Sequence, residues 1–335
     1  MSNTIKIPLV SSEITGIWNS YMGESLLLCK FKYFLNTVED AEIRDILQHS
    51  LDLCNERIKI LTDLFNQERL PVPEGFKDKD VNITAPRLFT DTFYLQYISY
   101  SSRVAMQNYT MTLIQIARAD IRDYFSKCIQ EYIDLYNKST ELKLSKGIFI
   151  RAPHVEVPKE VQYVKSESFL VDWFGKKRAL LAGEITHIFS INFASVTRKA
   201  LLVGFAQVCR DKKISNYILR GVDLATRQTD MLNSILENED IPIPSPSDSY
   251  VTDSTAAPFS EKLMLNKIII ICSAKISSIG TAVTDTRRSD LLTIYTKLTN
   301  ELMEYSKDGL DIMIHNGWLE QPPQAIKHKN LVGVK

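Results

Sequence analysis

The sequence has little of what marks the more specialised classes of protein. It holds five cysteines without a CxxC pair, and five histidines, among its 335 residues. Forty basic and forty acidic residues cancel, and the longest basic cluster is the run Lys176-Lys177-Arg178. A disulfide framework is therefore not expected, and the cysteines are predicted to be reduced core thiols of a cytoplasmic protein. Without a basic field, we expect neither nucleic acid nor a membrane among the partners.

Membrane-directed segments are also lacking. The first eight residues contain no apolar run of the kind that a secretory signal needs. The most apolar stretch, residues 263–283, is flanked by Lys262 and interrupted by Lys267 and Lys275. We therefore expect a buried bundle helix there rather than a membrane span.

Catalytic motifs are missing as well. The sequence contains no Walker loop and none of the patterns GxGxxG, GxSxG or HExxH. A Ser/His/Asp or Cys/His triad stays open, because its members meet only in space. An enzyme with a dispersed site, such as a hydrolase, is therefore the weakest of three hypotheses about function.

What the sequence does contain is an internal duplication. Glu13-Ile14-Thr15 recurs 171 positions later as Glu184-Ile185-Thr186, and Leu70-Pro71-Val72-Pro73 recurs at the same offset as Ile241-Pro242-Ile243-Pro244. A period this long indicates repeated domains rather than a solenoid. Later matches, at an offset of 170, are Arg118 with Arg288, Asp120 with Asp290, Gly147 with Gly317 and Pro153 with Pro323.

Each copy is predicted to form four α-helices. The first helices are expected at about 12–36 and 183–209, and the third at about 87–118 and 259–286. The second and fourth helices carry apolar or small residues at spacings of four and three, which is typical of helices that pack in a bundle. In the second helices this stripe consists of Ile43, Leu47, Ser50, Cys54, Ile58, Leu61 and Phe65 in copy one, and Ile214, Ile218, Gly221, Ala225, Thr229, Leu232 and Leu236 in copy two.

The lengths of the connections predict the topology. Only a few residues separate the first helix from the second and the third from the fourth, so each pair is expected to be antiparallel. About twenty residues, 67–86 and 238–258, separate the second helix from the third, which is enough to cross a bundle. The sequence therefore predicts an all-α fold of two tandem ferritin-like four-helix bundles, each with a long crossover between helices 2 and 3.

Domain boundaries and helix ends follow from the same pattern. We expect a first bundle over 1–153, a connecting segment over 154–182 and a second bundle with a C-terminal tail over 183–335. The aromatic part of the connecting segment, 169–174, is expected to pack on the bundles. Asp120 and Asp290 are predicted to be the N-caps of the fourth helices, and Gly147 and Gly317 are predicted to end them.

Five segments spread over nearly the whole chain carry a family resemblance. They are 85–89 (Ala-Pro-Arg-Leu-Phe), 146–153, 168–175, 253–260 and 316–323. On these segments the chain resembles the DUF3231 proteins of Bacillus-type spore formers, a tandem-repeat, ferritin-like family without an assigned activity and distantly similar to coat-F-type spore coat proteins. The resemblance implies the ferritin-like fold and an association with sporulation or the spore coat, and it transfers no catalytic residue.

A ferritin-like fold raises the question of a di-metal site. Such a site takes a Glu from each of two helices and a Glu-x-x-His pair from each of the other two. The sequence has one such pair, Glu184-Ile185-Thr186-His187, in a first helix, and Gly16 replaces the histidine in copy one. Glu184 and His187 are the candidate metal ligands, for Fe or Mn. The favoured interpretation is an acidic helix N-terminus with a surface histidine and no cofactor.

Two hypotheses about function therefore lead. The first is a non-enzymatic structural or interaction protein, with protein partners or self-association, in the sporulation or spore-coat setting that the resemblance implies. The second is a ferritin-like protein that binds a metal or a small ligand at an atypical site. The small residues Ser50, Cys54, Gly221 and Ala225 leave open either a close helix approach or a cavity for a small apolar ligand.

Overall fold

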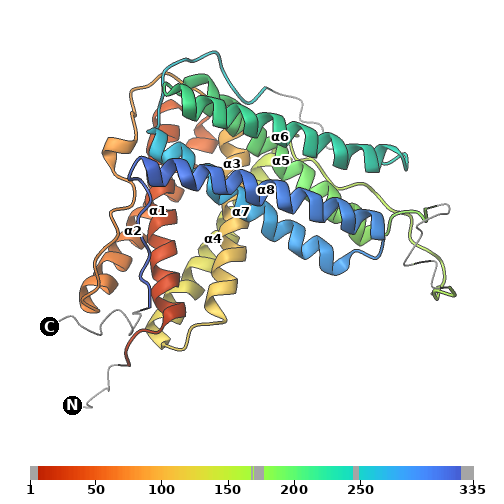
Figure 1. Cartoon of the computed structure of the whole chain (residues 1–335), viewed down its shortest axis with the longest axis horizontal. Coiled ribbons are helices and arrows are strands. Elements are labelled where there is room, and N and C mark those ends of the chain that lie inside the picture. The colour runs from red at the N-terminus through yellow and green to blue at the C-terminus, as the bar shows by residue number, and fades with distance from the viewer. Residues whose placement is uncertain (1–6, 167–168, 170–176, 244–248, 326–335) are drawn as a thin grey trace.

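The computed structural model describes residues 7–166, 169, 177–243 and 249–325, and this part of the chain folds into helices joined by loops (Figure 1). It contains eight α-helices and the short 3-10 helix η1 (Asp78–Asp80), and its β-type pairs are isolated bridges. The predicted all-α fold in two tandem halves is confirmed. The helices are α1 (Ser11–Thr37), α2 (Ala41–Gln67), α3 (Asp91–Leu113) and α4 (Ala119–Ser145) in the first half, and α5 (Ala182–Val208), α6 (Lys212–Glu237), α7 (Glu261–Asp285) and α8 (Ser289–His315) in the second.

The two halves run in different directions. In Figure 1, α1, α2 and α4 run from the top to the bottom of the view, whereas α5 to α8 extend across it to the right. Consecutive helices pack in pairs: α1 with α2, α3 with α4, α5 with α6, and α7 with α8. Their links are three to five residues long, which makes each pair antiparallel. Because α3 also packs on α5, the halves meet along their helices as well as their loops.

Side chains cap several helices where the sequence supplies an acceptor. Asp40 accepts the N–H groups of Glu42 and Ile43 at the start of α2, and the Ser260 hydroxyl accepts the N–H of Leu263 at the start of α7. Beyond α4 and α8, Gly147 and Gly317 have φ angles of 68° and 67°, so the prediction that left-handed glycines end these helices is confirmed.

The predicted N-caps of the fourth helices are wrong. Arg118 and Arg288 hold the cap positions of α4 and α8, and Asp120 and Asp290 lie inside the first turn. The reason is a competing ion pair, because each aspartate binds the guanidinium of the arginine two residues before it, at 2.5 Å and 2.8 Å.

The buried stripe of the second helices also differs from the predicted stripe at one position. Ile58 and Thr229 are only half-buried, whereas Arg57 and Gln228, one residue earlier, are 2% and 1% exposed. The prediction followed the more apolar residue rather than the strict spacing of four and three, which runs from Cys54 through 57 to 61. The correct stripe therefore brings a guanidinium into the core of the first half and an amide into the core of the second.

The long crossovers of the two halves bond to each other. The N–H of Asn82 donates to the carbonyl of Pro258 at 2.8 Å, and the N–H of Ser260 donates to the carbonyl of Asp80 at 3.0 Å. The Ser260 hydroxyl also donates to the Asp80 carboxylate at 2.7 Å, so the residue that caps α7 is itself held by the first half. Backbone groups that a loop would otherwise leave unpaired are thus satisfied between the halves. Further bonds join Thr90 N–H to Tyr250 O and Thr252 N–H to Leu88 O.

An aromatic cluster fills the junction beneath these loops. Phe259 packs edge-on against Tyr33 of α1 at 5.3 Å between ring centroids, and it also contacts Phe205 of α5. Gly204 leaves room for Phe89 of the first half, because a Cβ at this glycine would lie 2.5 Å from the Phe89 ring. The junction is therefore a close-packed part of the core.

The structure also describes the cysteines, part of the aromatic segment and the most apolar helices. All five cysteines are free, and four of them are buried. Of the aromatic segment 169–174, only Phe169 lies within the described residues; its ring lies 4.5 Å from the guanidinium of Arg178, and the packing of the remainder stays a prediction. By length and composition α5 and α7 could each span a membrane, but 67% and 50% of their most apolar windows are buried inside the protein, as is typical of core helices.

Candidate functional site

The two candidate metal ligands lie one turn apart on α5 and face different partners. The buried Glu184 carboxylate accepts the N–H groups of Leu181 at 2.9 Å and Arg287 at 3.0 Å, and it pairs with Arg178 at 2.8 Å. His187 Nε2 instead lies 2.9 Å from a carboxylate oxygen of Asp285 on α7. Among the described residues, no group of three or more His, Cys, Asp and Glu side chains is placed to hold a metal ion. Metal binding by Glu184 and His187 stays an untested prediction.

The equivalent glutamate of the first half makes the same kind of contact. Glu13 accepts the N–H groups of Val10 at 2.9 Å, Ala117 at 3.2 Å and Arg118 at 2.9 Å. In both halves this carboxylate therefore joins the start of the first helix to the loop before the fourth. That shared role accounts for the recurrence of Glu-Ile-Thr in the sequence.

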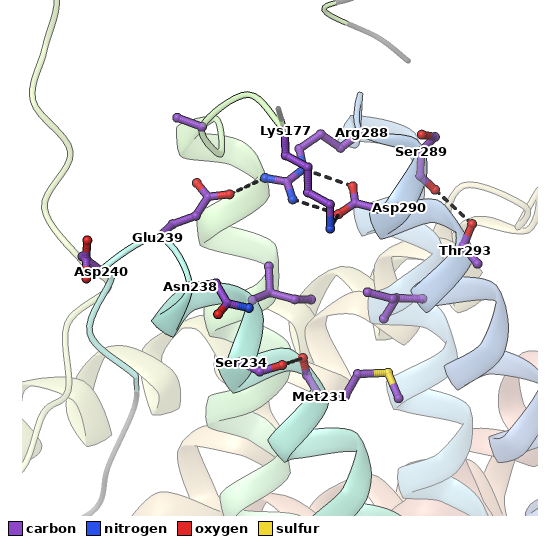
Figure 2. A pocket seen from close by; sticks show the side chains of 13 residues that line it. Lys177, Met231, Ser234, Asn238, Glu239, Asp240, Arg288, Ser289, Asp290 and Thr293 are labelled. Carbon is purple, nitrogen blue, oxygen red and sulfur yellow. Dashed lines mark hydrogen bonds and ion pairs between the residues drawn. The ribbon is translucent and has the colours of Figure 1, made fainter. Parts of the chain in front are cut away.

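A cavity of about 1010 Å³ opens at this end of the second half (Figure 2). In Figure 2, Arg288 lies between Glu239 and Asp290 and makes ion pairs with both, and Lys177 reaches Asp290 at 3.0 Å. The hydrogen bond from Arg288, together with Lys177, holds the pKa of Asp290 well below its usual value. The charges that line this cavity are thus largely engaged with one another.

The first half repeats this ionic group. Arg118 pairs with Glu68 at 2.9 Å and with Asp120 at 2.5 Å, at positions that match Arg288, Glu239 and Asp290. This network recurs in both copies, its charges pair with one another, and it stabilises the helix ends. The two halves differ instead at their centres.

The centre of the first half holds an ion pair surrounded by phenols. Arg57 of α2 contacts Glu24 of α1 at 3.1 Å and Glu131 of α4 at 2.8 Å, and its guanidinium lies 4.0 Å from the ring centroid of Tyr132. The same Glu24 oxygen accepts the hydroxyls of Tyr109 and Tyr132, each at 2.7 Å. Charged groups can stay in this core because they are paired and hydrogen-bonded.

The matching positions in the second half carry different residues. Ser195 replaces Glu24 and Gln228 replaces Arg57, while Glu301 matches Glu131. Gln228 keeps the contact to the fourth helix, because its amide donates to the Glu301 carboxylate at 2.9 Å. Two new cations enter this core, Arg198 of α5 and Lys275 of α7, at 6% and 4% exposure.

A small cavity of about 30 Å³ lies between these groups. Gly221 and Ala225, two of the small residues singled out in the sequence, do line a cavity, although charged side chains share its wall. Gly221 also permits a close contact between helices. A Cβ there would lie 2.1 Å from the Tyr305 hydroxyl, and the Tyr305 ring stacks on Tyr217 at 4.4 Å. The other lining residues are Ser195, Arg198, Leu202, Leu224, Gln228, Ile268, Ile271, Cys272, Lys275 and Leu302.

A second pair of buried cations lies at the junction of the halves. Lys30 of α1 and Lys267 of α7 face the same aromatic ring, Tyr97, with Nζ-to-centroid distances of 4.1 Å and 4.9 Å. Within the described residues the Lys30 ammonium makes no hydrogen bond, and neither lysine forms a salt bridge. Burial lowers the pKa of Lys267 to about 7, and burial together with the charge of Lys267 lowers the pKa of Lys30 well below its usual value.

Sequence reasoning missed the buried cations. Arg57 occupies the four–three register of its helix, so strict spacing alone would have placed it in the core. Lys267 and Lys275 interrupt the most apolar stretch, and from the sequence they argue against a membrane span without showing that they are core residues. The sequence signal for a buried cation was a charged residue on an otherwise apolar face of a helix.

Comparisons with known proteins give one family and one solved structure. A family model described as a protein of unknown function, DUF3231, matches residues 2–161 and again 168–331. A search of curated proteins found no match. Among solved structures, a candidate spore coat protein of Bacillus halodurans C-125 is 18% identical, with a TM-score of 0.41, over 45% of this chain and 98% of that chain.

Proposed function

The chain belongs to the DUF3231 family, and from this premise we propose that it is a non-enzymatic structural or interaction protein built from two ferritin-like bundles. One observation carries the proposal: the centre of each half is occupied by buried cations. Arg57 stands in the first centre, and Arg198 and Lys275 stand in the second. These are the positions that a di-metal protein of this architecture would give to carboxylates and imidazoles.

The residues at these centres do not fit a pair of divalent metal ions. In the first half two carboxylates, Glu24 and Glu131, are both bound to Arg57. At the centre of the second half, Glu301 is the acidic group among the described residues, and it accepts a hydrogen bond from Gln228. A fixed guanidinium or ammonium repels a divalent cation over the same few ångströms that would bind it to a carboxylate. The donor set therefore favours a packed structural core over Fe or Mn chemistry.

Exposed apolar side chains in the connecting segment support the interaction part of the proposal. Val157, Val161 and Tyr163 are 83%, 82% and 81% exposed, and they lie in an extended stretch between the halves. Apolar groups gathered in this way are typical of contact surfaces. We propose that this stretch binds a second copy of the chain, and the association with the spore remains a proposal that rests on the family resemblance.

Native mass spectrometry with elemental analysis tests the absence of a metal cofactor. The full chain, purified without chelator, is expected to have the mass of the polypeptide without stoichiometric iron or manganese. Stoichiometric metal with oxidase turnover would overturn the proposal. If metal is found, the double variant Glu184→Ala/His187→Ala separates the predicted site from others, because its metal content falls only if those residues are ligands.

Light scattering after gel filtration tests self-association. The full chain is expected to elute as a dimer or larger species, and the double variant Val157→Lys/Val161→Lys is expected to shift it toward the monomer. Met303→Lys, at a 58% exposed position on α8, is the matched control and should leave the mass unchanged. A monomeric wild-type chain would refute binding of a second copy.

The proposed division at 1–153, 154–182 and 183–335 has its own test. Limited proteolysis is expected to cut within the exposed part of the connecting segment and to give two fragments. Because the crossovers and the aromatic junction bind the halves, the fragments should still elute together under native conditions. Early cuts inside a helix pair would contradict this division.

A further inference from the structure

The centres of the two halves differ in the sign of their charge. In the first half, Arg57 is offset by Glu24 and Glu131, which leaves a net charge of −1 when all three are ionised. In the second half the corresponding glutamate has become Ser195 and the arginine has become Gln228, while Leu27 and Ala105 of the first half are matched by Arg198 and Lys275. With Glu301 as the acidic group, the second centre carries a net charge of +1 when Arg198, Lys275 and Glu301 are all ionised.

Neither cation of the second centre reaches a carboxylate. Arg198 donates from Nε to the carbonyl of Ala194 at 3.1 Å, and from Nη2 to the carbonyl of Ile191 at 3.1 Å and the hydroxyl of Ser195 at 2.8 Å. Within the described residues its Nη1 group makes no hydrogen bond. Lys275 Nζ donates to the side-chain carbonyl of Gln228 at 2.7 Å, which leaves two of its three N–H groups free for another acceptor.

Both cations line the cavity of about 30 Å³. A buried site needs about 10–15 Å³ on this measure to hold one water molecule, so the space suits a particle slightly larger than water. The wall offers donors from Arg198 and Lys275, and the rest is mostly apolar. A cavity of this size, with two cationic side chains and no acidic residue in its lining, has the chemistry of an anion site.

Burial makes the uncompensated charge costly. It lowers the pKa of Arg198, and it lowers the pKa of Lys275 well below its usual value. An arginine side chain stays protonated in proteins, so deprotonation cannot relieve the charge of Arg198. A counter-ion that entered the cavity would relieve it.

We propose that the centre of the second half binds one small monovalent anion between Arg198 and Lys275. The anion supplies the negative charge that Glu24 supplies in the first half, and it brings the net charge of the second centre from +1 to zero. The cavity limits it to a halide or a one-carbon carboxylate such as formate, and it excludes sulfate, phosphate and larger organic acids. The site is structural, because it lies among helices α5 to α8 and the anion would join α5 to α7.

Thermal unfolding of the full chain in different sodium salts tests the proposal. At equal ionic strength, chloride, bromide or formate is expected to raise the unfolding midpoint by a few degrees over gluconate, which is too large for the cavity. A ligand that binds only the native state stabilises it in proportion to the logarithm of its concentration. The shift should therefore grow steadily as the anion concentration rises tenfold.

Two variants locate the effect. Lys275→Met removes one of the two donors and is expected to abolish the difference between chloride and gluconate. Lys297→Met removes an exposed positive charge from the same half and should leave the difference intact. A shift that persists in Lys275→Met would place the anion elsewhere and overturn the proposal, as would equal midpoints in all four salts.

Crystals grown in bromide provide a measurement that does not depend on the stability of a variant. An anomalous peak between the Arg198 guanidinium and the Lys275 ammonium would support a halide. If the cavity shows no bromide while formate alone stabilises the protein and gives density there, the occupant is the carboxylate and the anion site still stands. Ordered water in the cavity under every condition would refute it.

Discussion

Replacement of Lys267 by methionine should stabilise the protein, although it removes a buried contact. Lys267 is 5% exposed, and its ammonium lies against Tyr97 beside a second buried lysine, Lys30. Burial lowers its pKa from the usual 10.5 to about 7. The native state thus binds fewer protons than the unfolded chain between pH 7 and 10.5, so this lysine makes the free energy of unfolding rise with pH across that window.

The magnitude follows from the same shift. One pKa unit corresponds to about 1.4 kcal/mol, so a lysine that is half protonated at pH 7 costs on the order of 4 kcal/mol of stability there. Methionine has nearly the same length, and it gives up a cation–π contact worth about 1–2 kcal/mol. We therefore expect Lys267→Met to raise the free energy of unfolding at pH 7 by about 2–3 kcal/mol, which is the difference between those two values.

Urea unfolding followed by far-UV circular dichroism at pH 7, 8 and 9 measures the effect. The advantage of the variant over wild type should shrink by about 1 kcal/mol between pH 7 and 8 and by close to 1.4 kcal/mol between pH 8 and 9, because in this range the unfolded wild-type chain keeps the proton that the native lysine has lost. Lys297→Met, on the exposed surface of α8, serves as the control and should show neither the gain nor the slope. A variant that is less stable at pH 7, or an advantage that does not change with pH, would refute the argument.

Two further predictions concern the centres of the halves. Gly221→Ala should lower stability by about 1–3 kcal/mol in thermal unfolding, because its Cβ would lie 2.1 Å from the Tyr305 hydroxyl. Gly23→Ala is the control and should not lower stability, because a Cβ there meets nothing within 4 Å. Equal effects of the two substitutions would contradict the packing argument. Arg57→Met should cost about 3–5 kcal/mol in urea unfolding because it leaves Glu24 charged and unpaired, and the double variant Arg57→Met/Glu24→Gln should recover part of that loss. A double variant no better than the single one would show that the pair is not the source of the cost.

Much of the fold could be predicted because it follows from local patterns. The repeated Glu-Ile-Thr and Pro-containing segments predicted the two halves. The stripes of the second helices begin and end within two residues of the ends of α2 and α6. The lengths of the links predicted the antiparallel pairs. These features depend on residues close in sequence, which is why a single chain was enough to find them.

The rest depended on contacts between distant residues. Aspartate is a residue type that favours the N-cap position, and only the position of Arg118 shows that Asp120 forms an ion pair instead. Hydrophobicity favours Ile58 over Arg57 as the core residue, and the partners that make a buried guanidinium possible, Glu24 and Glu131, lie 33 and 74 residues away. The bonds between the crossovers span about 160 to 180 residues, beyond the reach of any local pattern.

The bonds between the crossovers also bear on how the gene has evolved. The first half alone would expose to solvent the surface that the second half now covers. That surface includes the Tyr33 ring, which packs on Phe259, and the Asp80 carboxylate, which accepts a hydrogen bond from Ser260. Once each copy had come to rely on the other for these contacts, neither could be deleted without loss of both.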